Sequence, residues 1–306
     1  MEKAYDFSEI EYYKAEQQTI IAIVSGKKVS LNPTGIVAIG QPGAGKTGLT
    51  RYLTINFMQE MNEDIVHIDP DLVGQFHPRY KGIMESKGLD SFSYLAKFSS
   101  RALKTINTYC LERKFNLMTE GTFRDTSGYM RVFKEMKENG YKIDLNLLAV
   151  HKIESLISSM ERYFYMLEHR IPVRIVSIKP HNEAYENMLK TLKQVEDEKL
   201  ATRIRVFNRG KDELIPNLVY SSDMPNERYQ TPLEALNGER KRDRDRLIAS
   251  EQKVKNRLEY LKREASLHGS GEEIFKQILE IENMYQEEIS KQKGYEQAKD
   301  DGTITL

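Results

Sequence analysis

Short apolar runs alternate with stretches of helical periodicity along the first two thirds of the chain. The apolar runs predict five strands, at residues 36–39, 65–68, 115–119, 145–150 and 203–207. Between them, apolar side chains recur every three or four residues, which predicts helices at 48–61, 91–113, 125–139, 152–170 and 181–200. Because strands alternate with helices, the pattern predicts an α/β fold with a parallel sheet and helices on both faces.

The two ends of the chain have a different pattern. Residues 1–33 predict a helical lead-in before the first strand. Beyond residue 222 the chain is rich in charge, and two apolar stripes separated by residues 268–271 predict a helical hairpin, docked on the domain or on a partner. We therefore expect three parts: a lead-in at 1–33, a core at 34–222 and a charged hairpin extension at 223–306.

Charge and hydropathy exclude several classes of protein. The 306 residues carry 46 basic and 46 acidic side chains, so no net field draws the chain to nucleic acid or to an anionic membrane. Charges of alternating sign at residues 240–246 predict a solvated helix face. No apolar run reaches eighteen residues. We expect a cytoplasmic protein with neither nucleic acid nor membrane as a partner, and the single cysteine, Cys110, as core filling.

The first predicted strand leads directly into a phosphate-binding motif. Residues 40–47 read GQPGAGKT and match the pattern G-x-x-x-x-G-K-[ST]. Its glycines let the backbone wrap around a phosphate chain, Lys46 can reach the β- and γ-phosphates, and Thr47 can hold Mg²⁺. The helix that follows favours a bound anion at its N-terminus. The expected nucleotide contacts are Gly40, Gln41, Pro42, Gly43, Ala44, Gly45, Lys46, Thr47 and Gly48.

A phosphate loop alone does not separate a kinase from an ATPase or a switch. Phosphoryl transfer also needs a group that accepts the proton of the nucleophile. Asp71, just past the second predicted strand, is the best base, and Asp69 could orient a Mg²⁺-bound water. Both could instead be turn residues beside Pro70.

A carboxylate also marks the end of the third predicted strand. Glu120 precedes Gly121 and Thr122, and this small, polar step suggests the close approach of a ligand. The alternative is a buried carboxylate that caps the helix beginning at Asp125. After the fifth strand, position alone makes Asn208 and Arg209 the expected neighbours of the adenine.

Arginines follow the fourth predicted strand, where small-molecule kinases often carry a lid. Guanidinium groups suit the charge that a transferring phosphoryl group spreads over its oxygens. Arg162, Arg170 and Arg174 stand on or just beyond the helix there. They could instead form salt bridges to Glu161 or Glu168.

Short motifs at matching spacings connect these fragments. They are Gly26-Lys27-Lys28, Pro33, the phosphate loop, Ile68-Asp69-Pro70-Asp71, His77-Pro78, Glu120-Gly121-Thr122, Gly140-Tyr141, Ala149-Val150, Lys152-Ile153, Glu161-Arg162-Tyr163 and Asn208-Arg209. Together, over about residues 20–220, they resemble the zeta toxin family, kinases of bacterial toxin–antitoxin systems that phosphorylate UDP-N-acetylglucosamine.

The resemblance implies roles for individual residues. Lys46 matches the phosphate lysine of the family and Asp71 its catalytic base, and both Asp71 and Glu120 would contact substrate. Glu120 and Thr122 match the family's substrate-side Glu-Gly-Thr motif.

Three further positions bear on the transition state and the sugar. Arg162 matches the arginine that follows the lid glutamate. The second transition-state arginine is most similar to Arg174, with Arg170 as the alternative. Lys104 stands where the family usually has a substrate-binding glutamate, and this change of sign bears on which sugar nucleotide is bound.

The resemblance also implies cofactors and a partner. It implies ATP or GTP with Mg²⁺, and transfer of the γ-phosphoryl to the 3′-hydroxyl of the amino sugar, which blocks cell-wall synthesis. The implied partner is a small helical antitoxin that covers the nucleotide site. Two alternatives stay open: a phosphate-loop kinase of another sugar, a nucleoside or an antibiotic, and a non-catalytic nucleotide-binding switch.

Overall fold

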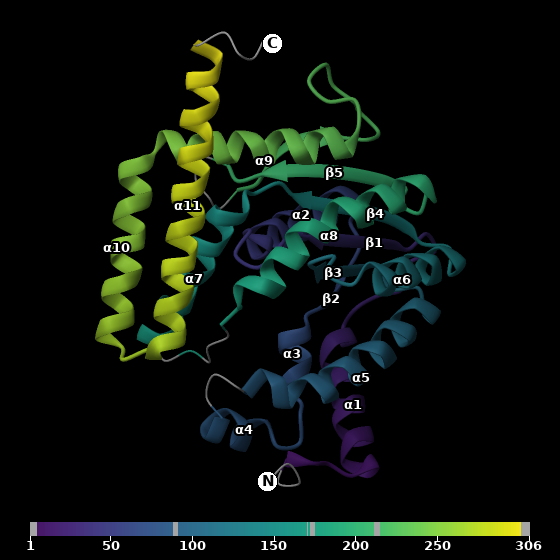
Figure 1. The fold of residues 1–306 in the computed structure, drawn as a ribbon. Helices are drawn as coiled ribbons and strands as arrows, with labels where there is room; N and C mark the ends of the chain where they lie inside the picture. The colour runs from purple at the N-terminus through teal and green to yellow at the C-terminus, as the bar shows by residue number, and fades with distance from the viewer. Residues whose placement is uncertain (1–4, 88–90, 170, 172–174, 211–214, 301–306) are drawn as a thin grey trace.

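A six-stranded sheet forms the centre of the molecule. The computed structural model describes residues 5–87, 91–169, 171, 175–210 and 215–300. The strand order is β2-β3-β1-β4-β5-β6 (Figure 1). All neighbouring strands are parallel except β6, which runs antiparallel to β5. The strands are β1 (Thr34–Ile39), β2 (Val66–Ile68), β3 (Leu117–Gly121), β4 (Lys142–Leu148), β5 (Arg203–Asn208) and β6 (Asn217–Ser221).

Helices cover both faces of this sheet, so the predicted fold class is confirmed. Ile36 and Ala38 of β1 pack with α2 on one face. Val37 and Ile39, which point the opposite way, belong to the larger core on the other face. The helices that bury these two faces are α1 (Glu9–Val24), α2 (Lys46–Met61), α5 (Ser91–Glu112), α6 (Thr126–Glu138), α8 (Ile178–Asp197) and α9 (Pro232–Ala249).

A second core joins the C-terminal helices to the body of the protein. The helices α7 (Lys152–Glu168), α10 (Glu251–Leu267) and α11 (Gly271–Asp300) share it, and Figure 1 shows them side by side. Leu258, Leu261 and Tyr285 are almost fully buried in it. The predicted hairpin is therefore present as α10 and α11, hereafter the C-terminal hairpin, and α7 is the surface on which it docks.

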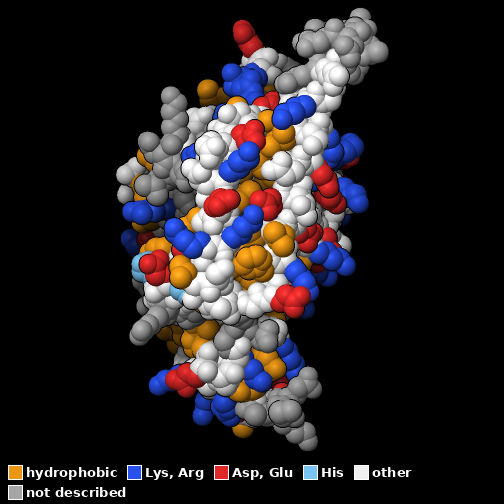
Figure 2. All heavy atoms as spheres, turned by 60° about the vertical axis from the view of Figure 1, so that its left-hand side comes forward, with side chains coloured by type: hydrophobic (Ala, Val, Ile, Leu, Met, Phe, Trp, Pro, Cys, Tyr) orange, Lys and Arg blue, Asp and Glu red, His pale blue; other side chains and the backbone are white. Residues whose placement is uncertain are grey.

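The face that carries the C-terminal hairpin is highly charged. Figure 2 shows basic and acidic side chains interspersed on it. Some are paired one helical turn apart, as in Lys276 with Glu272 at 3.0 Å. This arrangement is typical of a solvated helix face. The same prediction for residues 240–246 was wrong in part, because Arg240 is buried and its guanidinium lies over the Tyr185 ring. Within the described ranges, none of the helices has the length and apolar character needed to cross a membrane.

Several boundaries differ from the sequence-based prediction. The strand β3 extends to Gly121, so Glu120 lies inside the strand instead of after it. The helix α8 begins at Ile178 and includes Pro180 in its first turn, where a missing N–H costs no helical hydrogen bond. The strand β6 and the short helices α3 (Pro70–Gly74) and α4 (Tyr80–Lys87) were not predicted. The division of the chain at residue 222 stays a prediction.

Candidate active site

The phosphate loop joins β1 to α2 and lies against α7. Gly43 and Gly45 have φ values of +76° and +100°, which favour glycine. A Cβ atom on Gly43 would come within 1.9 Å of the Ser155 carbonyl oxygen. Position 43 therefore needs glycine for two reasons, its backbone conformation and its contact with α7.

The loop presents donors at the N-terminus of α2. Among the described residues, no acceptor receives the backbone N–H groups of Gly43, Gly45 or Thr47. Gly45 caps the helix without a side chain. Lys46 Nζ donates to the carbonyl oxygens of Gly40 (2.8 Å) and Gln41 (3.4 Å), so its ammonium lies over the loop. Such a group of backbone donors with a lysine is suited to bind phosphate.

The Gln41 side chain fastens the loop from inside. It is fully buried, and its Nε2 donates to Val150 O (2.8 Å) and Ser155 Oγ (3.0 Å). Ser155 Oγ lies 2.9 Å from Nε2 of the buried His181, whose pKa burial lowers to about 4. Gln41 can therefore contact a nucleotide only through its backbone, and its side chain positions the loop.

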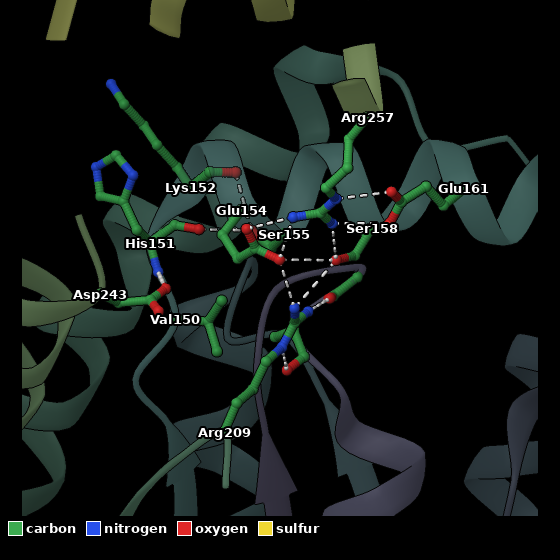
Figure 3. A network of polar contacts seen from close by, with 12 residues as sticks. Val150, His151, Lys152, Glu154, Ser155, Ser158, Glu161, Arg209, Asp243 and Arg257 are labelled. Carbon is green, nitrogen blue, oxygen red and sulfur yellow. Dashed lines mark hydrogen bonds and ion pairs between the residues drawn. The ribbon is translucent and has the colours of Figure 1, made fainter. Parts of the chain in front are cut away.

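Arg209, just after β5, donates hydrogen bonds to two carbonyl oxygens of the phosphate loop. Its Nε donates to Ala44 O at 3.3 Å, and its Nη2 donates to Gly43 O. Its Nη1 donates to Glu154 Oε1 (2.8 Å) and Ser158 Oγ (3.0 Å) on α7 (Figure 3). Arg209 thus ties the phosphate loop to α7 through both ends of its guanidinium.

Asn208, the other predicted nucleotide neighbour, faces α9. Its Nδ2 donates to Glu239 Oε2 at 2.7 Å, and the side chain is buried. Glu239 also accepts from the hydroxyl of Tyr229 at 2.8 Å. In this structure the Asn208 amide joins β5 to α9, and its contact with adenine stays a prediction.

The site also uses a guanidinium that the sequence did not single out. Arg257 of α10 donates to Glu154 and Glu161 on α7, at 2.7 Å to one oxygen of Glu154 and 2.7 Å to both oxygens of Glu161. Burial alone would lower the pKa of Arg257, but the bonds to these glutamates raise it overall. Nothing in the spacing of the sequence marks this contact, which spans about a hundred residues of chain.

Glu120 lies between β2 and the phosphate loop. Its Oε1 is 3.1 Å from the hydroxyl of Thr50 and 3.6 Å from Nε2 of His67. Burial alone would raise the pKa of Glu120, but His67, the charge of Lys46 and the Thr50 hydroxyl lower it overall. An ionised carboxylate therefore stands beside the phosphate lysine. The sequence could have marked Thr50, which follows Lys46 by one helical turn.

Asp69 and Asp71 leave the sheet at the same edge as Glu120. The register pairs Ile68 with Thr119 of β3, and Glu120 with Ala38 of β1. The carboxyl ends of these strands therefore meet, which is where open α/β sheets bind ligands. Asp69 caps α3 by accepting the Asp71 N–H at 2.8 Å, and Asp71 is exposed in the first turn of that helix.

The Gly-Thr step after Glu120 has a structural explanation. A Cβ atom on Gly121 would come within 1.9 Å of the Tyr129 hydroxyl, which also accepts the Thr122 N–H at 3.1 Å. Tyr129 therefore explains the glycine at position 121, and the close approach of a ligand at this step stays a prediction. The Thr122 side chain, partly exposed, stays a predicted substrate contact.

The remaining predicted residues are exposed on helices or lie outside the described part of the chain. Lys104 is exposed on α5, and Arg162 is exposed on α7. The alternative that Arg162 pairs with Glu161 is not realised, since Arg257 takes both oxygens of Glu161. Arg170 and Arg174 lie outside the described residues.

The sheet order, the loop and the carboxylates at the strand ends together define a phosphate-loop kinase fold. The sequence model of the zeta toxin family matches residues 22–219, about two thirds of the chain. The chain belongs to the zeta toxin family.

Individual relatives agree with this assignment. Toxin zeta of Enterococcus hirae is 28% identical over 212 residues, which are 69% of this chain and 73% of that protein. Toxin PezT of Streptococcus pneumoniae is 26% identical, over 67% of this chain and 80% of that protein. A solved structure of the PezAT toxin–antitoxin system of the same bacterium has a TM-score of 0.67 and 25% identity, and the match covers 83% of this chain and 99% of that one.

Proposed function

We propose that this protein is the toxin of a toxin–antitoxin system and acts as a kinase of UDP-N-acetylglucosamine. It transfers the γ-phosphoryl group of ATP to the 3′-hydroxyl of the amino sugar, and the product blocks cell-wall synthesis. Membership of the zeta toxin family supports the reaction and the acceptor. The observation that carries the proposal is the meeting of Lys46, Glu120 and the Asp69–Asp71 segment at one edge of the sheet.

Each residue has a task in this reaction. The N–H groups of the loop and the Lys46 ammonium bind the β- and γ-phosphates and neutralise the charge that develops during transfer. Asp71 accepts the proton of the sugar hydroxyl. Glu120, ionised at neutral pH, accepts hydrogen bonds from the acceptor sugar nucleotide. Thr122, two residues after Glu120, is a second substrate contact. Arg162 adds positive charge from α7 in the transition state.

Thr47 of the phosphate loop and Asp69, at the end of β2, are the oxygen donors that would hold a magnesium ion. Mg²⁺ is usually held by one or two protein oxygens together with phosphates and water. The Thr47 hydroxyl, exposed at the start of α2, and the Asp69 carboxylate supply such oxygens. When bound, the ion neutralises charge between the β- and γ-phosphates. GTP can replace ATP, because the loop recognises only the phosphates.

The partner is an antitoxin protein. The relatives are named as toxins, and the solved structure that matches over 83% of this chain is of a toxin–antitoxin system. A small helical antitoxin covers the nucleotide site of this protein in the cytoplasm until it is removed.

A mass screen tests the function. The protein is incubated with ATP, Mg²⁺ and a panel of nucleotide sugars, free sugars and nucleosides. The mass of each candidate acceptor is then measured by mass spectrometry. We expect UDP-N-acetylglucosamine to gain the mass of one phosphate. Gain by another compound alone would identify a different acceptor, and since Lys104 replaces the family's usual glutamate, UDP-hexoses without the acetamido group belong in the panel.

A further inference from the structure

The C-terminal hairpin reaches the nucleotide site through one side chain. Arg257 stands on α10, and its guanidinium lies against α7, about one hundred residues earlier in the chain (Figure 3). Its side chain is only 20% exposed, so most of it is withdrawn from water. It forms four short bonds to two glutamates, of 2.7, 2.7, 2.7 and 2.9 Å.

Arg257 shares its acceptors with Arg209, the residue that holds the phosphate loop. Glu154 Oε1 accepts from Nη1 of both arginines, at 2.8 Å from Arg209 and 2.9 Å from Arg257. Ser158 Oγ also accepts from both, at 3.0 Å and 3.2 Å. Each acceptor that orients Arg209 Nη1 on α7 is therefore fixed on its other side by Arg257.

Arg257 supplies one of the two positive charges in this group of four side chains. Arg209 and Arg257 carry two positive charges, and Glu154 and Glu161 carry two negative ones. Without Arg257, one arginine faces two carboxylates, and a net negative charge stands beside a loop that must bind polyanionic phosphates. In a partly buried site such a charge is weakly screened.

The C-terminal hairpin packs closely on α7. Leu258, next to Arg257, is 1% exposed in the shared core, and Leu261 is fully buried one turn further on. Asp243 of α9 accepts the His151 N–H at 2.7 Å, which fixes the start of α7 as well. The Arg257 guanidinium is therefore presented by a helix whose neighbouring side chains are buried against α7.

We propose that Arg257 is a positioning residue of the nucleotide site: acting through Glu154 and Ser158, it fixes Arg209 over the phosphate loop. The C-terminal hairpin is then part of the nucleotide-binding machinery. This inference rests on the proposed function only in that the loop binds ATP. It assigns Arg257 no contact with the nucleotide.

ATP affinity of the full-length protein tests the assignment. The variants are Arg257→Gln, Arg257→Lys and the matched control Arg263→Gln, which removes an arginine that is 67% exposed on the same helix. We expect Arg257→Gln to raise the ATP Kd at least about 10-fold and Arg263→Gln to change it less than about 2-fold. Lysine keeps the positive charge but lacks the planar guanidinium that bonds to two carboxylates at once. Arg257→Lys should therefore bind ATP several-fold more weakly than the parent. Full recovery with lysine would overturn the positioning role.

A double-mutant cycle adds a readout that loss of stability alone would not give. If Arg257 acts through Arg209, Arg257→Gln should weaken ATP binding less than about 2-fold further in an Arg209→Gln background. Independent, multiplicative effects would contradict the proposal. If Arg257→Gln does not fold, Glu161→Gln is the second variant, because it removes one carboxylate that binds the Arg257 guanidinium. We expect it to raise the ATP Kd a few-fold. An unchanged Kd would count against the network.

The two proposals can fail separately. A parent that binds ATP but leaves UDP-N-acetylglucosamine unphosphorylated overturns the acceptor only. A parent that phosphorylates the sugar nucleotide while Arg257→Gln binds ATP equally well overturns the positioning role only.

Discussion

The nucleotide half and the acceptor half of the candidate site are built differently. In the nucleotide half, the side chain of Gln41 bonds the phosphate loop to Val150, and Arg209 donates to the carbonyl oxygen of Gly43 in the loop. Both side chains are mostly buried. In the acceptor half, Asp71 and Lys104 are exposed, and Glu120 is the better enclosed group, at 23% side-chain exposure. The side chains named in the nucleotide half are hydrogen-bonded and mostly buried, whereas those named in the acceptor half are more exposed.

This difference separates binding from specificity. A hydrogen-bonded phosphate cradle binds ATP in one geometry whatever the acceptor is, because its donors are already aligned. In the proposed function the acceptor half recognises the acceptor with few groups, so Lys104 is predicted to affect which sugar nucleotide is used. Variants in the first half should therefore lower nucleotide affinity, and variants in the second should lower turnover at unchanged nucleotide affinity.

Lys46→Ala should have the largest effect. Its ammonium is the group that both halves share, since it lies over the loop and its charge also acts on Glu120. We expect turnover of UDP-N-acetylglucosamine to fall about 10²–10⁴-fold, as for the loss of preorganised charge stabilisation. Steady-state kinetics measure it, and unaltered turnover would refute the phosphate-lysine role.

Arg162→Ala should lower turnover by about 10²-fold and leave the ATP Kd within a few-fold of the parent. The reason is that the contact proposed between Arg162 and the phosphoryl group would strengthen in the transition state. Arg131→Ala, at an exposed arginine of α6, is the control and should leave both quantities unchanged. Equal losses of affinity and turnover would place Arg162 in ground-state binding instead.

Gly43→Ala should weaken ATP binding by at least about 10-fold. The new methyl group meets the Ser155 carbonyl, and the left-handed backbone costs a further 1–2 kcal/mol, roughly, for any residue with a Cβ. Gly140→Ala is the matched control, since Gly140 has a φ of +75° but open space around it. The Gly140→Ala protein should be less stable but should bind ATP like the parent. A similar loss of ATP affinity in both variants would show that backbone strain, and not the contact with α7, lowers the affinity.

His181→Gln should make the stability of the protein less dependent on pH in the acidic range. Burial lowers the pKa of His181 to about 4, so between about pH 6.5 and 4 the unfolded chain takes up a proton that the folded chain refuses. The parent therefore loses about 2–3 kcal/mol between pH 7.5 and 4.5 through this residue. Glutamine does not titrate, so denaturant unfolding of the variant should show a smaller loss. The same pH dependence in both proteins would contradict the buried, neutral histidine.

The sequence predicted most of the nucleotide half and the regular elements around it. Continuous β-branched runs and the glycine-rich motif placed β1, the loop and α2 within two residues of their observed bounds. The edge strand β6 was missed because it buries only its last residues, and α3 is too short to show a helical period. The first helix of the predicted hairpin is in fact two helices. The helix α9 ends just before Ser250, and α10 begins directly after it.

The long-range polar contacts could not be read from the sequence. The glycine at 121 suggested a ligand and did not indicate the contact with Tyr129, because a close approach does not reveal which group makes it. The sequence analysis did not single out Arg257 in the charge-rich region beyond residue 222, because its contact with Glu154 exists only in the folded chain. Pairing of charges depends on the docking of the hairpin, which local patterns do not specify.

The most direct test of the phosphoryl-transfer account is the single-turnover transfer of labelled γ-phosphate from ATP to UDP-N-acetylglucosamine by the parent and by Asp71→Asn. Both proteins are saturated with ATP, so only the acceptor half differs. We predict that label reaches the sugar nucleotide with the parent and at least about 100-fold more slowly with the variant, because asparagine cannot take the hydroxyl proton. Equal rates, or label released only to water by the parent, would contradict the account.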